Sequence, residues 1–214
     1  MLEPDGTAHF PGLLSGAAVE RLRDLADAHV SGGPGARLVV LSEDFHPVTD
    51  LARRLIGPAA QPVRAVVFDK REDANWAVAW HQDRTIIVRE RIETPGFGPW
   101  STKHGLLHVE PLFDVLASML TVRVHLDDCS VENAPLRVAL GSHVLGRVPA
   151  GEVAARAATC AQWTCLAQAG DVWAYATPIL HMSERTTVSA RRRVIQLDYA
   201  ARDLPGGLRW RGLA

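Results

Sequence analysis

A histidine and an aspartate stand two positions apart in the segment WHQDRT, residues 80–85. Residues i and i+2 of a β-strand point to the same face of a sheet, so His81 and Asp83 would project together. An imidazole and a carboxylate placed in this way are two arms of a facial triad, which holds non-haem Fe(II) and leaves coordination positions open. Taken alone, the pair is a weak signal, because a strand end followed by a polar turn has the same residues.

The C-terminal third offers a third ligand and an anion-binding group. His181 follows the apolar triplet PIL, in the connection between two strand-like segments. Arg192 begins the second segment eleven residues later, where an arginine can hold a carboxylate through two charge-assisted hydrogen bonds. Alternation puts Arg191 and Arg193 on the opposite face, so either Arg192 or its two neighbours point inward.

Two early helices and eight later strands would position these residues. Ser15 can cap a helix over residues 15–30, and a second helix over residues 47–57 ends at Gly57. Alternating segments separated by turn residues predict strands at residues 63–70, 76–83, 85–91, 119–128, 136–140, 162–168, 171–176 and 192–200. This order predicts a mainly β fold with flanking helices, in which an N-terminal helical layer packs on a double-stranded β-helix (jelly roll, cupin-like) core.

We expect residues 1–214 to form one domain, with a helical part over residues 1–60 and the jelly-roll core over about 63–200. The chain has 214 residues, of which 47% are hydrophobic, so it is long enough to bury roughly 70% of its unfolded surface.

Three motifs in order resemble one family, the phytanoyl-CoA dioxygenase (PhyH)-like Fe(II)/2-oxoglutarate-dependent oxygenases. They are WHQD, LDDCSVENAPLRVALGSH and GDVWAYATPILHMS followed by RRRVI, and the resemblance spans about residues 63–200. The early segment AHFPGLLS is similar to the family's N-terminal entry. Ala134 stands where the family's middle motif has glycine. Glycine eases a positive φ, so this turn must differ or be strained.

The resemblance implies a ligand set and a reaction. His81, Asp83 and His181 would hold Fe(II), with 2-oxoglutarate and O₂ as cosubstrates and succinate and CO₂ as products. Arg192 would bind the C5 carboxylate of 2-oxoglutarate with help from Ser183. Related halogenases lack the ligand carboxylate, so Asp83 favours hydroxylation over halogenation.

Arg123 falls where some family members have an aromatic residue in contact with the cosubstrate, so we consider it a further candidate. Five other residues are substrate-pocket candidates: His125, Arg84, Trp100, Lys103 and His104. His125 shares a strand face with Arg123, and this face lines the cavity only if it points inward.

Lys70, Lys103 and Arg84 could each meet an acidic substrate, but we expect each of these side chains to be exposed to solvent. The loop at residues 93–100 can be a lid or an ordinary connector, and residues 100–111 can be part of a lid.

Composition limits the partners. The formal net charge is −1, with no basic excess that would indicate nucleic acid and no apolar run long enough for a membrane span. Three irregularly spaced cysteines and the absence of a signal-like start favour a cytoplasmic protein that acts on a small molecule. An amino acid or a small biosynthetic intermediate is the expected substrate, and the oligomeric state cannot be predicted. The alternatives are a non-catalytic or differently metallated binding or sensor protein of the same fold, or a zinc hydrolase with the same three ligands.

Overall fold

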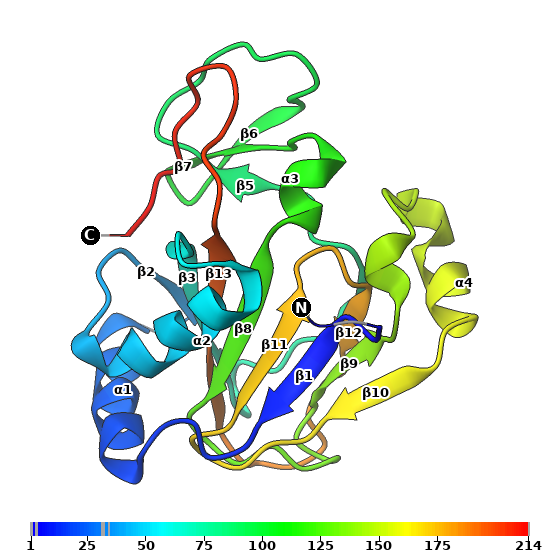
Figure 1. Cartoon of the computed structure of the whole chain (residues 1–214). Helices are drawn as coiled ribbons and strands as arrows, with labels where there is room; N and C mark the ends of the chain where they lie inside the picture. The colour runs from blue at the N-terminus through cyan, green and yellow to red at the C-terminus, as the bar shows by residue number, and fades with distance from the viewer. Residues whose placement is uncertain (1, 3, 31–32, 34, 214) are drawn as a thin grey trace.

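The structure is a computed structural model that describes residues 2, 4–30, 33 and 35–213, and its strands form three sheets (Figure 1). The major sheet has the order β1-β11-β8-β13-β3-β2, the minor sheet β10-β9-β12-β4, and the small sheet β5-β7-β6. The strands are β1 (Thr7–Phe10), β2 (Gly35–Leu38), β3 (Gln61–Lys70), β4 (Val78–His81), β5 (Ile86–Ile87), β6 (Trp100–Lys103), β7 (Leu106–Val109), β8 (Leu120–His125), β9 (Leu136–Ala139), β10 (Gln162–Cys165), β11 (Val172–Ala176), β12 (His181–Ser183) and β13 (Arg192–Ala200).

Two helices cover the outer face of the major sheet: α1 (Gly16–His29) and α2 (His46–Ile56). Leu22 of α1 and Leu51 of α2 belong to the same buried cluster as Val122 and Val124 of β8. Ser15 caps α1 as predicted, since its side chain accepts a hydrogen bond from the amide of Ala18. The sheets and these helices have the jelly-roll arrangement that the sequence predicted.

The inner face of the major sheet is polar and looks toward the minor sheet. Thr121, Arg123 and His125 alternate along β8 with the apolar residues that face the helices, and all six residues of β8 are buried. This settles which face of β8 points inward, which the sequence left open. Because a buried charge is costly without a partner or ligand, the inner face is where a binding site is expected.

The small sheet forms a separate lobe with α3 (Phe113–Ala117) and the C-terminal segment, at the top of Figure 1. Its apolar side chains form their own cluster, in which Ile86 and Val109 pack with Trp210, and Trp100 lies against it. The loop at residues 93–100 belongs to this lobe, as do residues 100–111. The strands β6 and β7 of this lobe were not predicted, and neither were β1, β2 and β12.

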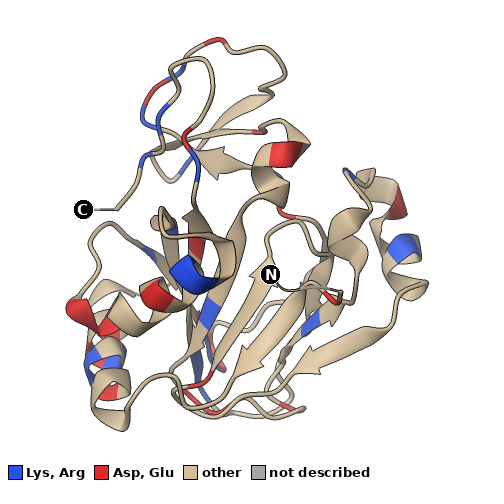
Figure 2. Cartoon of the chain, in the orientation of Figure 1, with Lys and Arg blue, Asp and Glu red and all other residues tan. Residues whose placement is uncertain are grey.

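Charged residues of both signs are spread over α1, α2 and the loops, whereas the strands have few charged residues in this view (Figure 2). A short helix, α4 (Val153–Ala158), lies beside the minor sheet. Among the described residues, none of the helices has the length and apolar character that a membrane span requires.

Candidate metal centre

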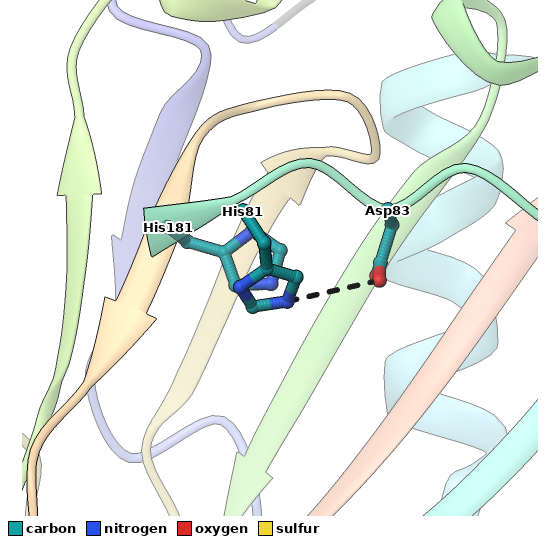
Figure 3. Close-up of side chains that lie close together, drawn as sticks. All are labelled: His81, Asp83 and His181. Carbon is teal, nitrogen blue, oxygen red and sulfur yellow. Dashed lines mark ion pairs between the residues drawn. The ribbon is translucent and has the colours of Figure 1, made fainter. Parts of the chain in front are cut away.

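Three predicted ligands converge on the inner face of the minor sheet (Figure 3). His81 ends β4, His181 begins β12, and the two are cross-strand partners, while Asp83 lies two residues beyond β4. One ligand atom from each residue lies within 4.8 Å of the others. The two imidazole centroids are 4.1 Å apart, and His81 Nε2 is 4.0 Å from Asp83 Oδ1. Side chains separated by about 100 residues therefore form one candidate site for a cation.

Both histidines are oriented by their own backbone. Nδ1 of His81 is 2.9 Å from the carbonyl oxygen of Ala79, and Nδ1 of His181 is 2.9 Å from that of Ile179. A proton on Nδ1 makes it the donor in each bond and leaves the Nε2 lone pair toward Asp83. Burial, together with the neighbouring His81, lowers the pKa of His181 to about 4, so this ring is neutral, as a metal ligand must be.

Asp83 is held ionised by its neighbours. Burial alone would raise the pKa of Asp83, but its neighbours outweigh burial and keep the pKa below its ordinary value. Because the His181 ring is neutral, Arg64 is the permanent positive charge that stabilises this carboxylate. Arg64 Nη2 is 3.9 Å from Asp83 Oδ2, and Arg64 Nε is 2.8 Å from Asp198 Oδ2. Arg64, Asp198 and Thr121 are cross-strand neighbours on β3, β13 and β8, and the Thr121 hydroxyl donates to Asp198 at 3.1 Å. Arg64 and Asp198 were not predicted from the sequence.

A cavity of about 200 Å³ adjoins the metal group, and its deep end is cationic. Lys70, Arg123 and Arg192 line it from three adjacent strands of the major sheet, with Ser183 opposite. Lys70 Nζ donates to Ser183 Oγ at 3.1 Å and to the carbonyl of Glu184 at 2.5 Å. Arg192 is 3% exposed, and its Nε and Nη1 have no hydrogen-bond partner.

No carboxylate within the described ranges forms an ion pair with Lys70, Arg123 or Arg192. Lys70 and Arg192 are direct cross-strand partners, and like charges in that position repel. Burial, with Arg192 and Arg123 adding to it, lowers the pKa of Lys70 to about 7. An anion with two carboxylates would supply the missing charge. Lys70 is 1% exposed, so its predicted solvent exposure was wrong.

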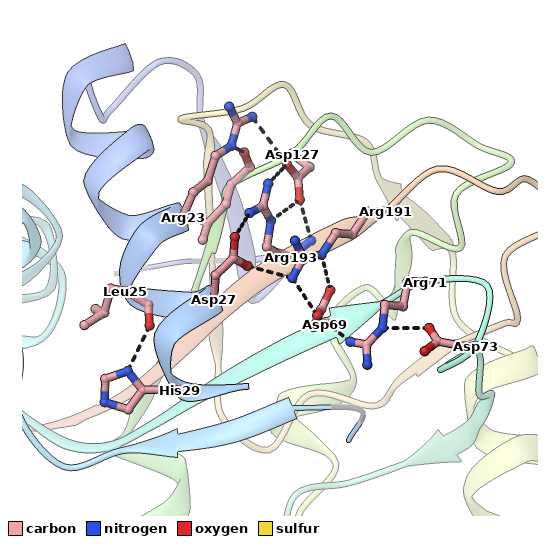
Figure 4. A network of polar contacts seen from close by, with 11 residues as sticks. Arg23, Leu25, Asp27, His29, Asp69, Arg71, Asp73, Asp127, Arg191 and Arg193 are labelled. Carbon is pink, nitrogen blue, oxygen red and sulfur yellow. Dashed lines mark hydrogen bonds and ion pairs between the residues drawn. The ribbon is translucent and has the colours of Figure 1, made fainter. Parts of the chain in front are cut away.

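The two arginines that flank Arg192 belong to a network of ion pairs with aspartates (Figure 4). Arg191 makes a bidentate ion pair with Asp69 on β3, at 2.8 Å for both contacts. Arg193 makes a bidentate pair with Asp127, at 2.8 and 2.9 Å. Of the three arginines, only Arg192 lines the cavity.

Three of the predicted pocket residues do not line this cavity. Arg84 donates to the carbonyl of Val148, Trp100 packs against the cluster of the small lobe, and Lys103 is exposed. The sequence could not tell to which lobe residues 93–104 belong, and contact of these three residues with substrate stays a prediction. His104 lines a second, adjacent cavity.

His125 is on the inner face, as its alternation with Arg123 allowed, but it is not part of the cavity wall. It is fully buried, and both of its ring nitrogens lack hydrogen-bond partners. Burial, with Arg123 and Arg192 adding to it, holds the pKa of His125 well below 6.5, so this ring adds no further positive charge to the cluster.

The unusual turn of the middle motif lies next to the cationic end. Ala134 has a φ of 50°, in the left-handed region that favours glycine, so the strain expected from the sequence is present. The Ser183 hydroxyl donates to the carbonyl of Ala134 at 3.2 Å, so the turn also fixes the side chain that accepts from Lys70.

A family model described as phytanoyl-CoA dioxygenase (PhyH) matches residues 2–194. Among solved structures, the epimerase SnoN from nogalamycin biosynthesis, in complex with Fe³⁺, alpha ketoglutarate and nogalamycin RO, is 18% identical with a TM-score of 0.64, over 95% of this chain and 87% of that chain. HygX from Streptomyces hygroscopicus, with nickel and 2-oxoglutarate bound, is 17% identical with a TM-score of 0.57, over 98% and 91%. The carbocyclase SnoK is 18% identical with a TM-score of 0.63, over 91% and 79%. No protein with a curated description matches the sequence.

Proposed function

The chain belongs to the phytanoyl-CoA dioxygenase family, and from that premise we propose that it is a non-haem Fe(II)/2-oxoglutarate-dependent oxygenase acting on a small molecule. The observation that carries the proposal is the pairing of a two-histidine, one-carboxylate group with a buried cationic end in the same cavity. A metal-binding protein without a dicarboxylate cosubstrate has no use for three buried cations that lack acidic partners.

The metal would be held by His81 Nε2, His181 Nε2 and one Asp83 oxygen. Two neutral imidazoles and one carboxylate suit Fe(II) and leave positions for cosubstrate and O₂. When bound, the iron would support the oxidative decarboxylation of 2-oxoglutarate by O₂ to succinate and CO₂, with the second oxygen atom inserted into a substrate C–H bond. The protein's part is to hold the reactants and to keep water out.

Lys70, Arg192 and Ser183 would bind the distal carboxylate of 2-oxoglutarate, and Arg123 would lie beside it. Arg192 has two donors without partners, which a planar carboxylate can accept from. Bound 2-oxoglutarate would also relieve the repulsion between Lys70 and Arg192 and raise the pKa of Lys70.

We propose hydroxylation as the outcome, because Asp83 occupies the coordination position that a halide would need. The substrate would be an amino acid or a small biosynthetic intermediate. The whole chain would form one dioxygenase domain, and a reducing compartment such as the cytoplasm would suit its three free cysteines.

The test is succinate formation by the protein loaded anaerobically with Fe(II) and 2-oxoglutarate and then exposed to O₂. We expect slow uncoupled turnover without substrate and faster turnover with a correct substrate. Asp83→Ala should abolish succinate formation. Asp73 is an exposed aspartate outside the cavity, so Asp73→Ala is the control and should leave succinate formation unchanged. Analysis of the product formed from the substrate then distinguishes hydroxylation from epimerisation or ring closure.

Two results would contradict the proposal. A protein that binds neither Fe(II) nor 2-oxoglutarate cannot be an enzyme of this class. If 2-oxoglutarate raises the melting temperature of the metal-free protein, but succinate never forms with Fe(II), the non-catalytic binding or sensor function is favoured instead.

A further inference from the structure

A second cavity of about 450 Å³ adjoins the cavity of the metal group. Arg64, Phe68 and Trp76 line both cavities, so these side chains form the boundary between the two. Residues from β2 and the hairpin turn at His104 complete the second cavity. A molecule seated there would reach the metal group past Phe68 and Trp76.

Of these two cavities, only the second is lined by Arg37. The register places it on the inner face of the major sheet, since Arg37 pairs with Val66, Val66 with Gln196, and Gln196 with Arg123. Direct partners share a face, so Arg37 lies on the same side of the sheet as the cationic end of the first cavity. β2 is the edge strand, which puts Arg37 at the far side of the site.

Arg37 has no acidic partner. In the part of the chain that the structure describes, it forms no ion pair, and its Nη1 is buried without a hydrogen-bond partner. Arg64, its nearest charged neighbour in the wall, is neutralised by Asp198 at 2.8 Å. Burial lowers the pKa of Arg37, and the charge of Arg64 lowers it further, while Asp198 opposes them only in part.

The rest of the wall is apolar and aromatic. Val66, Phe68 and Trp76 provide it, and Gly35 adds no side chain on the β2 side. A flat apolar group fits such a wall, because aromatic side chains pack against ring faces and edges. One uncompensated positive charge next to this wall matches a ligand with a single negative charge.

Resting on the proposed function, we infer that the second cavity is the substrate subsite, and that Arg37 binds a carboxylate of a substrate whose body is apolar and about the size of one ring. The carboxylate would lie at the β2 edge, and the body would extend along Phe68 and Trp76 toward the metal group. Arg64, held by Asp198, forms the wall between substrate and Asp83. Substrates without an acidic group would lack the main polar contact of this subsite.

The test compares two probes of equal shape, 3-phenylpropanoate and its neutral amide, by titration calorimetry. The protein is saturated with Ni(II) and 2-oxoglutarate, so that the cosubstrate position is filled. We expect the carboxylate to bind about 10-fold more tightly than the amide, as for one charge-assisted contact. Arg37→Gln should reduce this ratio to about 1 without changing the amide affinity.

Two control variants locate the probe. Arg54→Gln removes an exposed arginine on α2 and should leave the ratio unchanged. Arg192→Gln should weaken 2-oxoglutarate binding. When the probe titration is repeated on the metal-free Arg192→Gln protein, the preference for the carboxylate probe over the amide should still depend on Arg37. The melting temperature of each variant shows that it is folded.

The inference is overturned if wild-type protein fails to bind 3-phenylpropanoate, if it binds acid and amide equally, or if the preference depends on Arg192 rather than on Arg37. These outcomes differ from failure of the proposed function. A preference that depends on Arg37 in a protein that never binds Fe(II) or turns over 2-oxoglutarate would support the subsite alone. Turnover without such a preference would leave the oxygenase and remove the subsite.

Discussion

Replacing Lys70 with methionine should stabilise the unliganded protein and weaken its binding of 2-oxoglutarate. Lys70 is fully buried opposite Arg192, and its pKa of about 7 lies far below the ordinary 10.5. That difference corresponds to about 5 kcal/mol by which the folded protein disfavours the charged amine, at 1.36 kcal/mol for each pKa unit. Methionine fills a similar volume and removes the charge.

The net gain is smaller, because the variant also leaves Ser183 Oγ and the Glu184 carbonyl without their donor. Each lost hydrogen bond costs about 1 kcal/mol, so we expect a stabilisation of about 1–3 kcal/mol. That corresponds to a rise of about 3 °C in Tm for each kcal/mol in a chain of this size. Loss of a charge-assisted hydrogen bond should weaken 2-oxoglutarate binding by about 10- to 100-fold.

The pH dependence has a defined sign. Below pH 7 the amine is charged in both the folded and the unfolded protein, so the full penalty is present. Between pH 7 and 10.5 the folded protein releases the proton first, and the wild type becomes more stable relative to the variant. The difference in Tm between the variant and the wild type should therefore be largest below pH 7 and shrink as pH rises.

The assay is thermal unfolding of protein stripped of metal and cosubstrate, from pH 6 to pH 9, with calorimetry of 2-oxoglutarate binding to the metal-loaded form. The chain has one other lysine, Lys103, which is exposed, so Lys103→Met is the matched control and should change neither quantity. A lower Tm for Lys70→Met at pH 6 would refute the reasoning, because it would mean that the buried charge stabilises the unliganded fold.

Two further predictions concern the support of the site. Asp198→Asn leaves Arg64 with Asp83 as its acidic neighbour, so Arg64 would compete with the metal for Asp83. We expect the Ni(II) affinity, measured by calorimetry, to fall by about 10-fold. An unchanged affinity would count against this role of Asp198. Gly6→Ala combines a φ of 74° with a methyl group that would overlap the partly buried imidazole of His143, whereas Gly12→Ala has a φ of 59° and open space. In urea unfolding we expect a loss of about 1 kcal/mol for Gly12→Ala and at least about 2 kcal/mol for Gly6→Ala, and equal losses would exclude the steric contribution.

The family and the fold could be predicted from the sequence because they depend on local signals. Strand alternation and turn residues act between near neighbours in the sequence, and each of the three motifs consists of short segments. The family match and the sheets confirm the predictions made from them. His81 and Asp83 lie close together, as the sequence predicted, although β4 ends at His81 and Asp83 lies in the segment that follows the strand. Their roles as iron ligands stay a prediction, although the geometry suits the proposal.

Lys70, Arg64 and Arg37 could not be predicted, because their positions depend on strand register. A shift of one residue between two strands would turn a side chain to the other face of the sheet. Only the pairing of β3 with β13 puts Lys70 opposite Arg192 and Arg64 opposite Asp198. Arg37 lies on an edge strand of four residues, which is too short for its alternation to be recognised.

The same register explains why the proposed cosubstrate would bind in one direction. The cross-strand pair of Arg64 and Asp198 lies beside the metal group, and its two charges cancel. A carboxylate of the cosubstrate at this position therefore has only the metal to bind. The cross-strand pair of Lys70 and Arg192 consists of two basic side chains without an acid, and it lies beside Ser183. A dicarboxylate inserted with one end on the metal must put its other end on this second pair. The charges of β3 and β13, and not the shape of the cavity alone, therefore orient it.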